Sequence, residues 1–284
     1  MILITGASGN VGREVLKQIA ETGVPVRAAF QAVSKAAAAP SGVEVVTLDY
    51  NRPETVRAAL HGVDHVFLVG PPTAELPAME RRAVDEIKRA GGVRIVKLSA
   101  MGGRAATFPR QHADSEDYIQ ASGVPYTFLR PNGFMQNFSN YNAGTINTQN
   151  AFYGSQGEGK VSHIDIRDIG AVAVKVLTEA RHQRKSYTLT GPEALTNARI
   201  AQILSEELGR QIKYVNLTDE QYRQAAIRGG VAEWSAAAVT DLQRFYREGG
   251  ASAVSKDVEQ LLRRRPISFE QFSREHKSAF QRTA

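Results

Sequence analysis

The sequence predicts an α/β protein built on a parallel sheet, and three observations carry this prediction. First, five short apolar segments before residue 124 alternate with helical segments, and a sixth follows at 124–130. Second, a turn with three regularly spaced glycines joins the first apolar segment to a helical pattern. Third, the alternation stops near residue 191, after which helical patterns dominate. The expected fold is a Rossmann-type doubly wound parallel sheet with a smaller, mostly helical C-terminal substrate domain.

The first dozen residues predict a diphosphate site. The strand Ile2–Ile4 ends at three glycines, and a helix with an apolar face follows at about Val11–Thr22. Gly6 permits a tight turn, Gly9 lets the backbone approach a ligand, and Gly12 lets the helix lie close to the sheet. Backbone N–H groups and the positive end of the helix dipole then face the diphosphate of a dinucleotide. The predicted contacts in this turn are Gly6, Ser8, Gly9, Asn10, Val11 and Gly12.

The residues after the second strand, Val24–Phe30, lie where the adenosine ribose of a dinucleotide binds. No carboxylate occurs there, and Gln31, Ser34 and Lys35 can all donate to a phosphate. An acid would bind the ribose hydroxyls of NAD, so its absence favours NADP(H). The missing arginine leaves use of NAD(H) open as well, and Lys35 can equally be a solvated lysine at the start of a helix. Gln31 and Lys35 are therefore predicted cofactor contacts.

Three further strand ends supply candidate cofactor contacts. The strand 42–48 ends at Asp49, whose carboxylate can accept from the adenine amino group or cap the helix that follows. The apolar strand 65–69 ends in a turn with two prolines, at the sheet edge where ligands bind. The strand 93–98 ends at Ser99, whose hydroxyl can reach the nicotinamide or a substrate carbonyl. The predicted contacts at these ends are Asp49, Tyr50, Gly70, Pro71, Pro72 and Ser99.

A lid over the substrate is predicted after the sixth strand. The residues from Asn132 to Phe138 follow it directly and should lie near the nicotinamide, where apolar side chains can form a wall for a flat aromatic acceptor. Packing in the core is the alternative for these side chains, and also for Trp234, the single tryptophan. The candidate wall residues are Met101, Asn132, Phe134, Met135, Phe138 and Trp234.

Returning segments make the first domain discontinuous. A helix at 164–177 and a strand at 186–190 are expected to rejoin the first sheet. The dinucleotide-binding domain therefore comprises 1–131 and about 161–190, and the substrate domain comprises 132–160 and 191–284. Other expected elements are helices at 76–90, 197–208, 219–227 and 232–247 and a short strand at 211–216.

The composition excludes several kinds of site. The 284 residues include no cysteine, so disulfides, thiolate metal sites and cysteine nucleophiles are absent, and redox chemistry needs a bound cofactor. We expect neither flavin nor metal. The net charge of +6 comes from scattered basic residues, and the densest cluster, Arg263–Arg265, precedes Pro266 in the expected last turn of a helix. The positive excess favours anionic cofactors and substrates, and no nucleic-acid partner is expected.

The N-terminus and the hydropathy pattern bear on location. Met1 leads directly into the first strand without a charged leader. No apolar run approaches the roughly 18 residues of a membrane span. We therefore expect a cytoplasmic protein without a membrane partner, as a monomer or a homodimer.

Several segments together resemble a known family. They are the glycine turn, Asp49–Pro53, the helix with His112 and Glu116, the segment 122–137 with the sequence SGVPYTFLRPNGFMQN, and 163–168 with the sequence HIDIRD. They are similar to the NmrA-like group of atypical short-chain dehydrogenases, and within it to bacterial NAD(P)H-dependent quinone, azo-dye and triphenylmethane-dye reductases. The resemblance covers nearly the whole chain and is specific to the group rather than to one substrate.

The chain departs from the wider superfamily at the catalytic pair. That superfamily uses Tyr-x-x-x-Lys, in which the lysine lowers the pKa of a tyrosine that passes a proton to a carbonyl. None of the nine tyrosines here has a lysine four residues later, and His112 and Glu116 stand in the usual place. The resemblance therefore implies either hydride transfer to an acceptor that needs little acid catalysis or cofactor binding without chemistry.

Two functions follow from this choice. The first is an NADPH-favouring, flavin-free reductase of quinones, azo compounds or related dyes, whose small aromatic acceptors are already electrophilic. Its catalytic candidates are Ser99 and His112. The histidine is either a proton donor, with its usual pKa near neutrality, or a helix-start residue bonded to cofactor or backbone. The second function is a redox sensor that binds NAD(P) and a protein partner without turnover.

Overall fold

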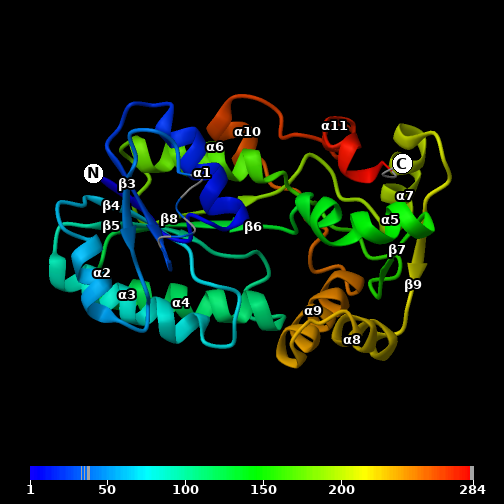
Figure 1. Ribbon diagram of the computed structural model, residues 1–284, viewed down its shortest axis with the longest axis horizontal. Coiled ribbons are helices and arrows are strands. Elements are labelled where there is room, and N and C mark those ends of the chain that lie inside the picture. The colour runs from blue at the N-terminus through cyan, green and yellow to red at the C-terminus, as the bar shows by residue number, and fades with distance from the viewer. Residues whose placement is uncertain (33, 35, 37–38, 282–284) are drawn as a thin grey trace. The chain divides into compact units, whose positions relative to one another are not determined.

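The computed structural model describes residues 1–281 except 33, 35, 37 and 38. The chain divides into two compact units, whose elements are labelled in Figure 1. The first unit comprises Met1–Ala100, Gln111–Arg130 and Ile166–Thr188, and the second comprises Met101–Arg110, Pro131–Asp165 and Leu189–Ala284. The segments 101–110 and 161–165 therefore pack with the second unit, whereas we expected them in the first.

A seven-stranded sheet forms the centre of the first unit, with the strand order β3-β2-β1-β4-β5-β6-β8. Its strands are β1 (Ile2–Ile4), β2 (Val26–Phe30), β3 (Glu44–Thr47), β4 (His65–Leu68), β5 (Arg94–Leu98), β6 (Tyr126–Pro131) and β8 (Lys185–Leu189). Neighbouring strands from β3 to β6 pair in parallel, which confirms the predicted sheet. The order reverses direction between β1 and β4, and open α/β sheets bind ligands outside the carboxyl ends of strands at such a point.

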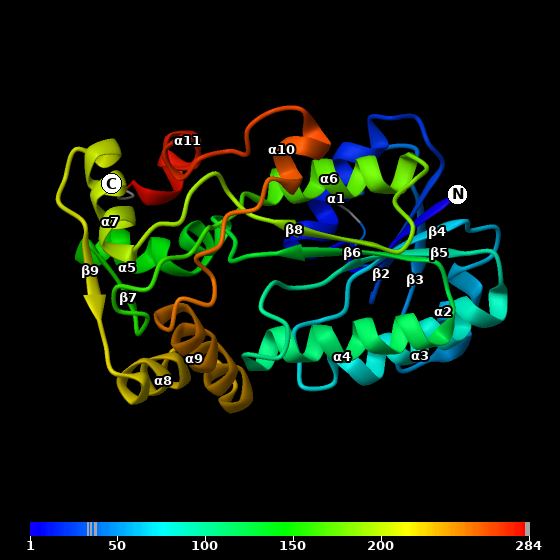
Figure 2. The ribbon, with the colours of Figure 1, turned by 180° about the vertical axis from the view of Figure 1, so that it is seen from behind.

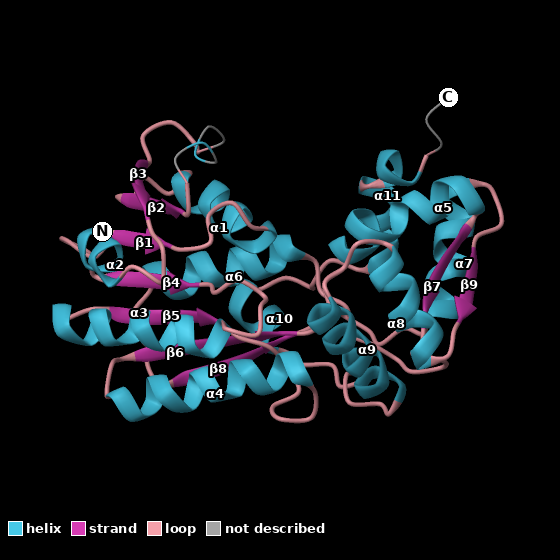
Figure 3. Ribbon diagram, turned by 60° about the horizontal axis from the view of Figure 1, so that its bottom comes forward, coloured by secondary structure: helices cyan, strands magenta, loops and turns pink. Residues whose placement is uncertain are grey.

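Helices cover both faces of this sheet (Figures 2 and 3). They are α1 (Asn10–Ala20), α2 (Pro53–Ala59), α3 (Leu76–Ala90), α4 (Thr107–Ser122) and α6 (Ile166–Thr178). α1 and α6 lie together on one face, and α2, α3 and α4 lie on the other. α6 approaches α1 closely at Gly170, where a Cβ would lie 2.7 Å from the Gln18 side chain.

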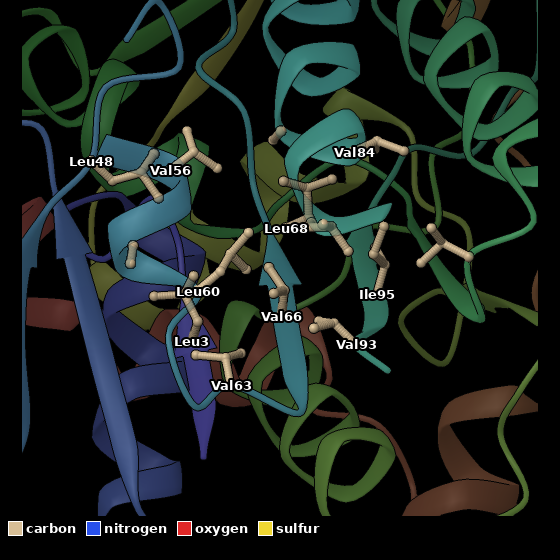
Figure 4. Close-up of a cluster of buried hydrophobic side chains, with 14 of the residues drawn as sticks. Leu3, Leu48, Val56, Leu60, Val63, Val66, Leu68, Val84, Val93 and Ile95 are labelled. Carbon is tan, nitrogen blue, oxygen red and sulfur yellow. The ribbon is translucent and has the colours of Figure 1, made fainter. Parts of the chain in front are cut away.

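The main core of the first unit lies between the sheet and the helices α2 and α3 (Figure 4). Leu3, Val66 and Ile95 come from three neighbouring strands, and Val56 and Val84 come from the two helices. All five are almost fully buried. Burying an aliphatic side chain of this size contributes about 1.5–3 kcal/mol, so this core fixes the strands whose ends carry the predicted site.

The second unit is mostly helical and contains one short parallel ladder, labelled in Figure 3. Its strands are β7 (Ala151–Gly154) and β9 (Lys213–Asn216). Its helices are α5 (Ala143–Gln149), α7 (Asn197–Leu208), α8 (Asp219–Arg228), α9 (Glu233–Arg247), α10 (Asp257–Leu262), α11 (Phe269–Glu275), the π-helix η2 (Phe138–Asn142) and the 3-10 helix η3 (Lys277–Phe280). The sequence did not predict η2, α5, β7 or α11, which are short and lack a long repeating pattern.

The expected cluster of basic residues lies just after the helix α10. α10 ends at Leu262, and Arg263 caps it with a φ of 56°. Arg263–Arg265 therefore follow the helix and do not form its last turn, which corrects our prediction.

Within the part of the chain that the structure describes, no helix combines the length and hydropathy of a membrane span. The same residues contain no group of three or more His, Asp or Glu side chains placed to hold a metal ion.

Candidate functional site

The turn between β1 and α1 has the geometry of a diphosphate cradle. Gly6 has a φ of 60°, and it accepts a hydrogen bond from Gly9 N–H at 2.9 Å. A Cβ at Gly12 would lie 2.2 Å from the Gly6 carbonyl oxygen, so glycine lets α1 begin this close to the turn. α1 begins at Asn10 with Gly9 as its N-cap, and among the described residues no side chain caps its first N–H groups. These donors, beside the exposed Ser8, fit an anionic group.

A hydrogen-bond cluster joins the carboxyl ends of β1 and β4. The Thr5 hydroxyl donates to the Phe67 carbonyl at 2.9 Å and accepts from Val69 N–H at 2.8 Å. The Tyr50 hydroxyl donates to the Val69 carbonyl at 2.8 Å. Tyr50 is buried in the core, where its side chain supports the strand end, and its contact with a cofactor stays a prediction. We missed Thr5, whose sequence signal is a hydroxyl directly before the glycine turn.

The predicted adenosine contacts follow β2 and β3. Gln31 is exposed directly after β2, and Lys35 lies outside the described residues. Asp49 is partly buried, and its carboxylate accepts from Asn51 N–H at 2.9 Å in a local turn. α2 takes Arg52 as its N-cap, so Asp49 does not cap that helix.

The proline turn after β4 is held by Glu80 of α3. Gly70 N–H donates to Glu80 Oε1 at 3.2 Å, and a Cβ at Gly70 would lie 3.0 Å from that oxygen. Gly70 and Pro71 are partly buried, whereas Pro72 is exposed. Our sequence analysis missed Glu80, although it lies among the buried residues of α3. A carboxylate at such a position requires a buried cation or donors.

Lys97 of β5 supplies the cation. Its Nζ lies 2.7 Å and 2.6 Å from the two carboxylate oxygens of Glu80, and both residues are 0 % exposed. The Lys97 Nζ also lies 3.3 Å from Nδ1 of His112. Burial, and next the charge of Lys97, hold the pKa of His112 well below its usual value. His112 is therefore neutral near pH 7, which removes the predicted charged proton donor. The signal that we missed is a lysine inside the apolar strand RIVKL.

Ser99 belongs to a second cluster, with the buried Glu116 of α4 and the partly exposed Arg130 of β6. The Ser99 hydroxyl donates to Glu116 Oε1 at 2.5 Å, and Arg130 Nε donates to the same oxygen at 2.9 Å. The hydroxyl proton is therefore committed to a carboxylate, and only its lone pairs remain for another group. The predicted contact of Ser99 with the nicotinamide or a substrate carbonyl stays a prediction, and in this structure the hydroxyl donates to Glu116.

Two of the predicted wall residues belong to the core of the second unit. Met135 and Phe138 are almost fully buried. The Phe138 ring packs edge-on against Phe152 and Phe269, with centroid distances of 5.6 Å and 5.1 Å. Core packing, the alternative that we left open, is therefore their role in this structure.

Asn132 is also structural. Its side-chain Nδ2 donates to Ser162 Oγ and to the Ala251 carbonyl, both at 2.8 Å, and its Oδ1 accepts from Gly133 N–H. Because the amide is buried and bonded on both sides, it fixes the loop after β6 and does not line a binding surface. The wall candidates that stay partly accessible are Met101, Phe134 and Trp234.

A pocket of about 520 Å³ lies within the second unit, beside α8 and α9. Trp234 lines it, and its ring packs edge-on against Phe108 at a centroid distance of 5.7 Å. Arg110 also lines the pocket and is exposed. A hydrogen bond from Arg247 lowers the pKa of Asp219 to about 2, so that this lining carboxylate stays ionised and paired. The charged side chains that line the pocket are three arginines and three acids, namely Arg110, Arg223, Arg244, Asp219, Glu220 and Asp241. An aromatic face among such groups suits a flat polar molecule.

His163 of the second unit makes stability depend on pH. Its Nδ1 donates to the Gly133 carbonyl at 3.2 Å, and its buried Nε2 meets no hydrogen-bond partner among the described residues. Burial lowers the pKa of His163 to about 4. The unfolded chain binds this proton near pH 6.5 and the folded protein only near pH 4. The free energy of unfolding should therefore fall as the pH drops through this window, by up to about 3 kcal/mol.

Urea unfolding between pH 6.5 and 4 measures this loss. In His163→Gln the slope should be smaller by nearly one proton, or about 1.4 kcal/mol per pH unit. His65, His112 and His182, whose pKa values are also lowered by burial, keep part of the slope in both proteins. The exposed His61 gives the matched control, His61→Gln. Equal slopes in the wild type and His163→Gln would contradict the prediction.

Known proteins are similar to this chain in sequence and in fold. A model of the NmrA-like family matches residues 1–272. The chain is 35% identical over 284 residues to an NAD(P)H azoreductase of Xenophilus azovorans, covering 99% of each chain. It is 36% identical over 285 residues to a (4-alkanoyl-5-oxo-2,5-dihydrofuran-3-yl)methyl phosphate reductase of Streptomyces griseus, again covering 99% of each. Its fold is similar to the crystal structure of an NADPH-dependent quinone oxidoreductase of Escherichia coli complexed with NADPH, with a TM-score of 0.90, 27% identity and coverage of 98% and 100%. The chain therefore belongs to the NmrA-like family.

Proposed function

We propose that this protein is an NAD(P)H-dependent reductase, with NADPH favoured, that passes hydride to a conjugated aromatic acceptor such as a quinone, an azo compound or a related dye. The observation that carries the proposal is the cradle at the start of α1, where Gly6 and Gly12 leave uncapped N–H groups open to a diphosphate. The azoreductase and the quinone oxidoreductase support the acceptor class. A reduced nicotinamide supplies a hydride when bound, and we propose that neither flavin nor metal takes part.

The residues that would hold this cofactor lie at the carboxyl ends of the strands. The first N–H groups of α1 would bind the diphosphate, and Asp49, which follows β3, would bind on the adenosine side. Gln31 is exposed directly after β2. No Asp or Glu occurs from Gln31 to Lys35 to repel a 2′-phosphate, which favours NADPH over NADH.

The proposed acceptors need no strong acid from the protein, and the candidate side chains of the site supply none. A quinone that takes a hydride gains two electrons and one proton, and one more proton from water completes the hydroquinone. His112 is neutral and the Ser99 hydroxyl donates its hydrogen bond to Glu116, so neither is a charged acid. Trp234 and Arg110 supply an aromatic face and a cation for a flat acceptor in the pocket of the second unit.

Oxidation of NADPH and NADH by the purified protein, followed by absorbance with a panel of quinones and azo dyes, tests this proposal. We expect turnover with at least one quinone, a higher kcat/KM with NADPH than with NADH, and no flavin absorbance. Tight cofactor binding without turnover on any acceptor would contradict the reductase. It would favour the second function, a redox sensor that binds NAD(P) and a protein partner.

Replacement of Trp234 tests the pocket. Trp234→Ala should raise the KM for a quinone by roughly threefold to tenfold, because it removes an aromatic contact worth about 0.5–1.5 kcal/mol. The KM for NADPH should stay unchanged, and Trp234→Phe, which keeps a ring, should resemble the wild type. Because Trp234 is the single tryptophan, its fluorescence also reports acceptor binding. An unchanged quinone KM in Trp234→Ala would exclude this pocket as the acceptor site.

A further inference from the structure

The buried pair of Glu80 and Lys97 holds two charges where water does not reach. Both residues are 0 % exposed, and the Lys97 ammonium bonds both oxygens of the Glu80 carboxylate. The ammonium also donates to the Leu98 carbonyl at 3.2 Å. A buried ion pair gives little net stability compared with apolar side chains of similar volume. Net stability therefore does not explain why the two charges are buried here, and the contact of Lys97 with a third residue indicates a different role.

That contact is with His112. The Lys97 Nζ lies 3.3 Å from Nδ1 of the imidazole. An ammonium has three N–H donors and no acceptor, and here it shares them among four acceptors. A lone pair on Nδ1 facing this cation is favoured over an N–H, so Nδ1 is assigned as the unprotonated nitrogen. Burial and the nearby charge lower the pKa of His112 and keep the ring neutral. A neutral imidazole that accepts at Nδ1 carries its single proton on Nε2.

We infer that Lys97 and Glu80 are positioning residues that fix His112 as its neutral Nε2–H tautomer, a hydrogen-bond donor for the acceptor atom that becomes negatively charged during reduction. Such a donor stabilises developing charge and keeps its own proton, so the proton that completes the product comes from water. The acceptor's part in this inference rests on the proposed function. The tautomer itself does not.

The neighbouring charges agree with this arrangement. Lys97 faces the imidazole from β5, and Glu80 of α3 acts through Lys97. Glu116 lies one turn along α4 from His112, but its carboxylate is bonded to Ser99 and Arg130. Glu80 Oε1 also accepts from Gly70 N–H. The same carboxylate therefore connects the turn after β4 with the ammonium that sets the tautomer.

The tautomer can be read by nitrogen-15 NMR of the protein with labelled histidines. His112→Gln identifies the His112 signals among those of the six histidines. In the wild type, without cofactor or acceptor, we expect Nδ1 to be unprotonated and Nε2 to be protonated at pH 6.5 and above. A protonated Nδ1, or a second proton taken up near pH 6.5 as in a free histidine, would overturn the inference.

A double variant tests the origin of the tautomer. Lys97→Met with Glu80→Gln removes the donor without leaving a buried charge, and the glutamine can still accept from Gly70 N–H. We expect both tautomers of His112 to appear and kcat for a quinone to fall about tenfold, with the KM for NADPH unchanged within about twofold. Lys88→Met, at an exposed position on α3, is the matched control and should match the wild type.

The outcomes separate this inference from the proposed function. If the double variant keeps the wild-type tautomer and kcat, Lys97 and Glu80 do not position His112. If the wild type shows the Nε2–H tautomer but turns over no acceptor, the proposed reductase fails while the positioning of His112 stands, because the NMR pattern is recorded without an acceptor.

Discussion

Lys97→Met alone should lower the free energy of unfolding by about 3–5 kcal/mol, one of the two largest effects that we expect in this protein. The substitution removes the cation and leaves the Glu80 carboxylate buried without its partner. Burying a carboxylate without a partner costs far more free energy than the apolar contacts of the new methionine contribute. Urea unfolding at neutral pH, followed by circular dichroism, measures the change.

The double variant Lys97→Met with Glu80→Gln completes the cycle. It should recover more than half of the lost stability, because it leaves no unpaired charge. Lys88→Met makes the same chemical change at an exposed position and should shift the free energy of unfolding by less than about 0.5 kcal/mol. A double variant as unstable as Lys97→Met, or a Lys97→Met protein as stable as the wild type, would show that the buried charges are not coupled.

Gly12→Ala should weaken NADPH binding by about two orders of magnitude. The added Cβ would lie 2.2 Å from the Gly6 carbonyl oxygen and 2.7 Å from the Gly6 carbonyl carbon. Both are backbone atoms that cannot rotate away, so the turn and the start of α1 must separate and the N–H donors lose their common direction. Calorimetric titration with NADPH measures the affinity, and urea unfolding should show a loss of about 1–3 kcal/mol.

Gly144→Ala is the matched control for this change. Gly144 lies in α5, and a Cβ there would meet no atom within 4 Å. Alanine is the better helix former, so this variant should be as stable as the wild type or more stable by up to about 1 kcal/mol, with unchanged NADPH affinity. Wild-type affinity in Gly12→Ala would remove the glycine turn from the proposed cofactor site.

Local signals located the long elements well. The helices α3 (Leu76–Ala90) and α7 (Asn197–Leu208) begin and end at the predicted residues. In α7 the reason is local chemistry, because the Thr196 hydroxyl accepts from Arg199 N–H at the start and Gly209 takes the left-handed conformation at the end. The strands could be predicted for a similar reason, because a short continuous apolar run between two helical segments is typical of a buried strand in a parallel sheet.

The segment after β6 shows where local signals fail. Its aromatic and sulfur-containing side chains indicated a wall for an aromatic acceptor or a piece of core, and sequence alone left both open. The structure packs Phe138 against Phe152 and against Phe269, which is more than 100 positions away in the chain. Which surface an apolar side chain covers depends on partners that the segment itself does not encode.

By itself, the sequence determined the glycine turn on which the predicted diphosphate site rests, because this turn needs only neighbouring residues to form, and it showed the absence of a Tyr-x-x-x-Lys pair. Only the tertiary structure decided the state of the charged groups that meet at the turn after β4 and behind it. Glu80, Lys97 and His112 come from a helix, a strand and a second helix, and their charges and tautomer depend on being buried together. Burial and Coulomb interactions act between segments brought together by folding, so no pattern within one segment reports them.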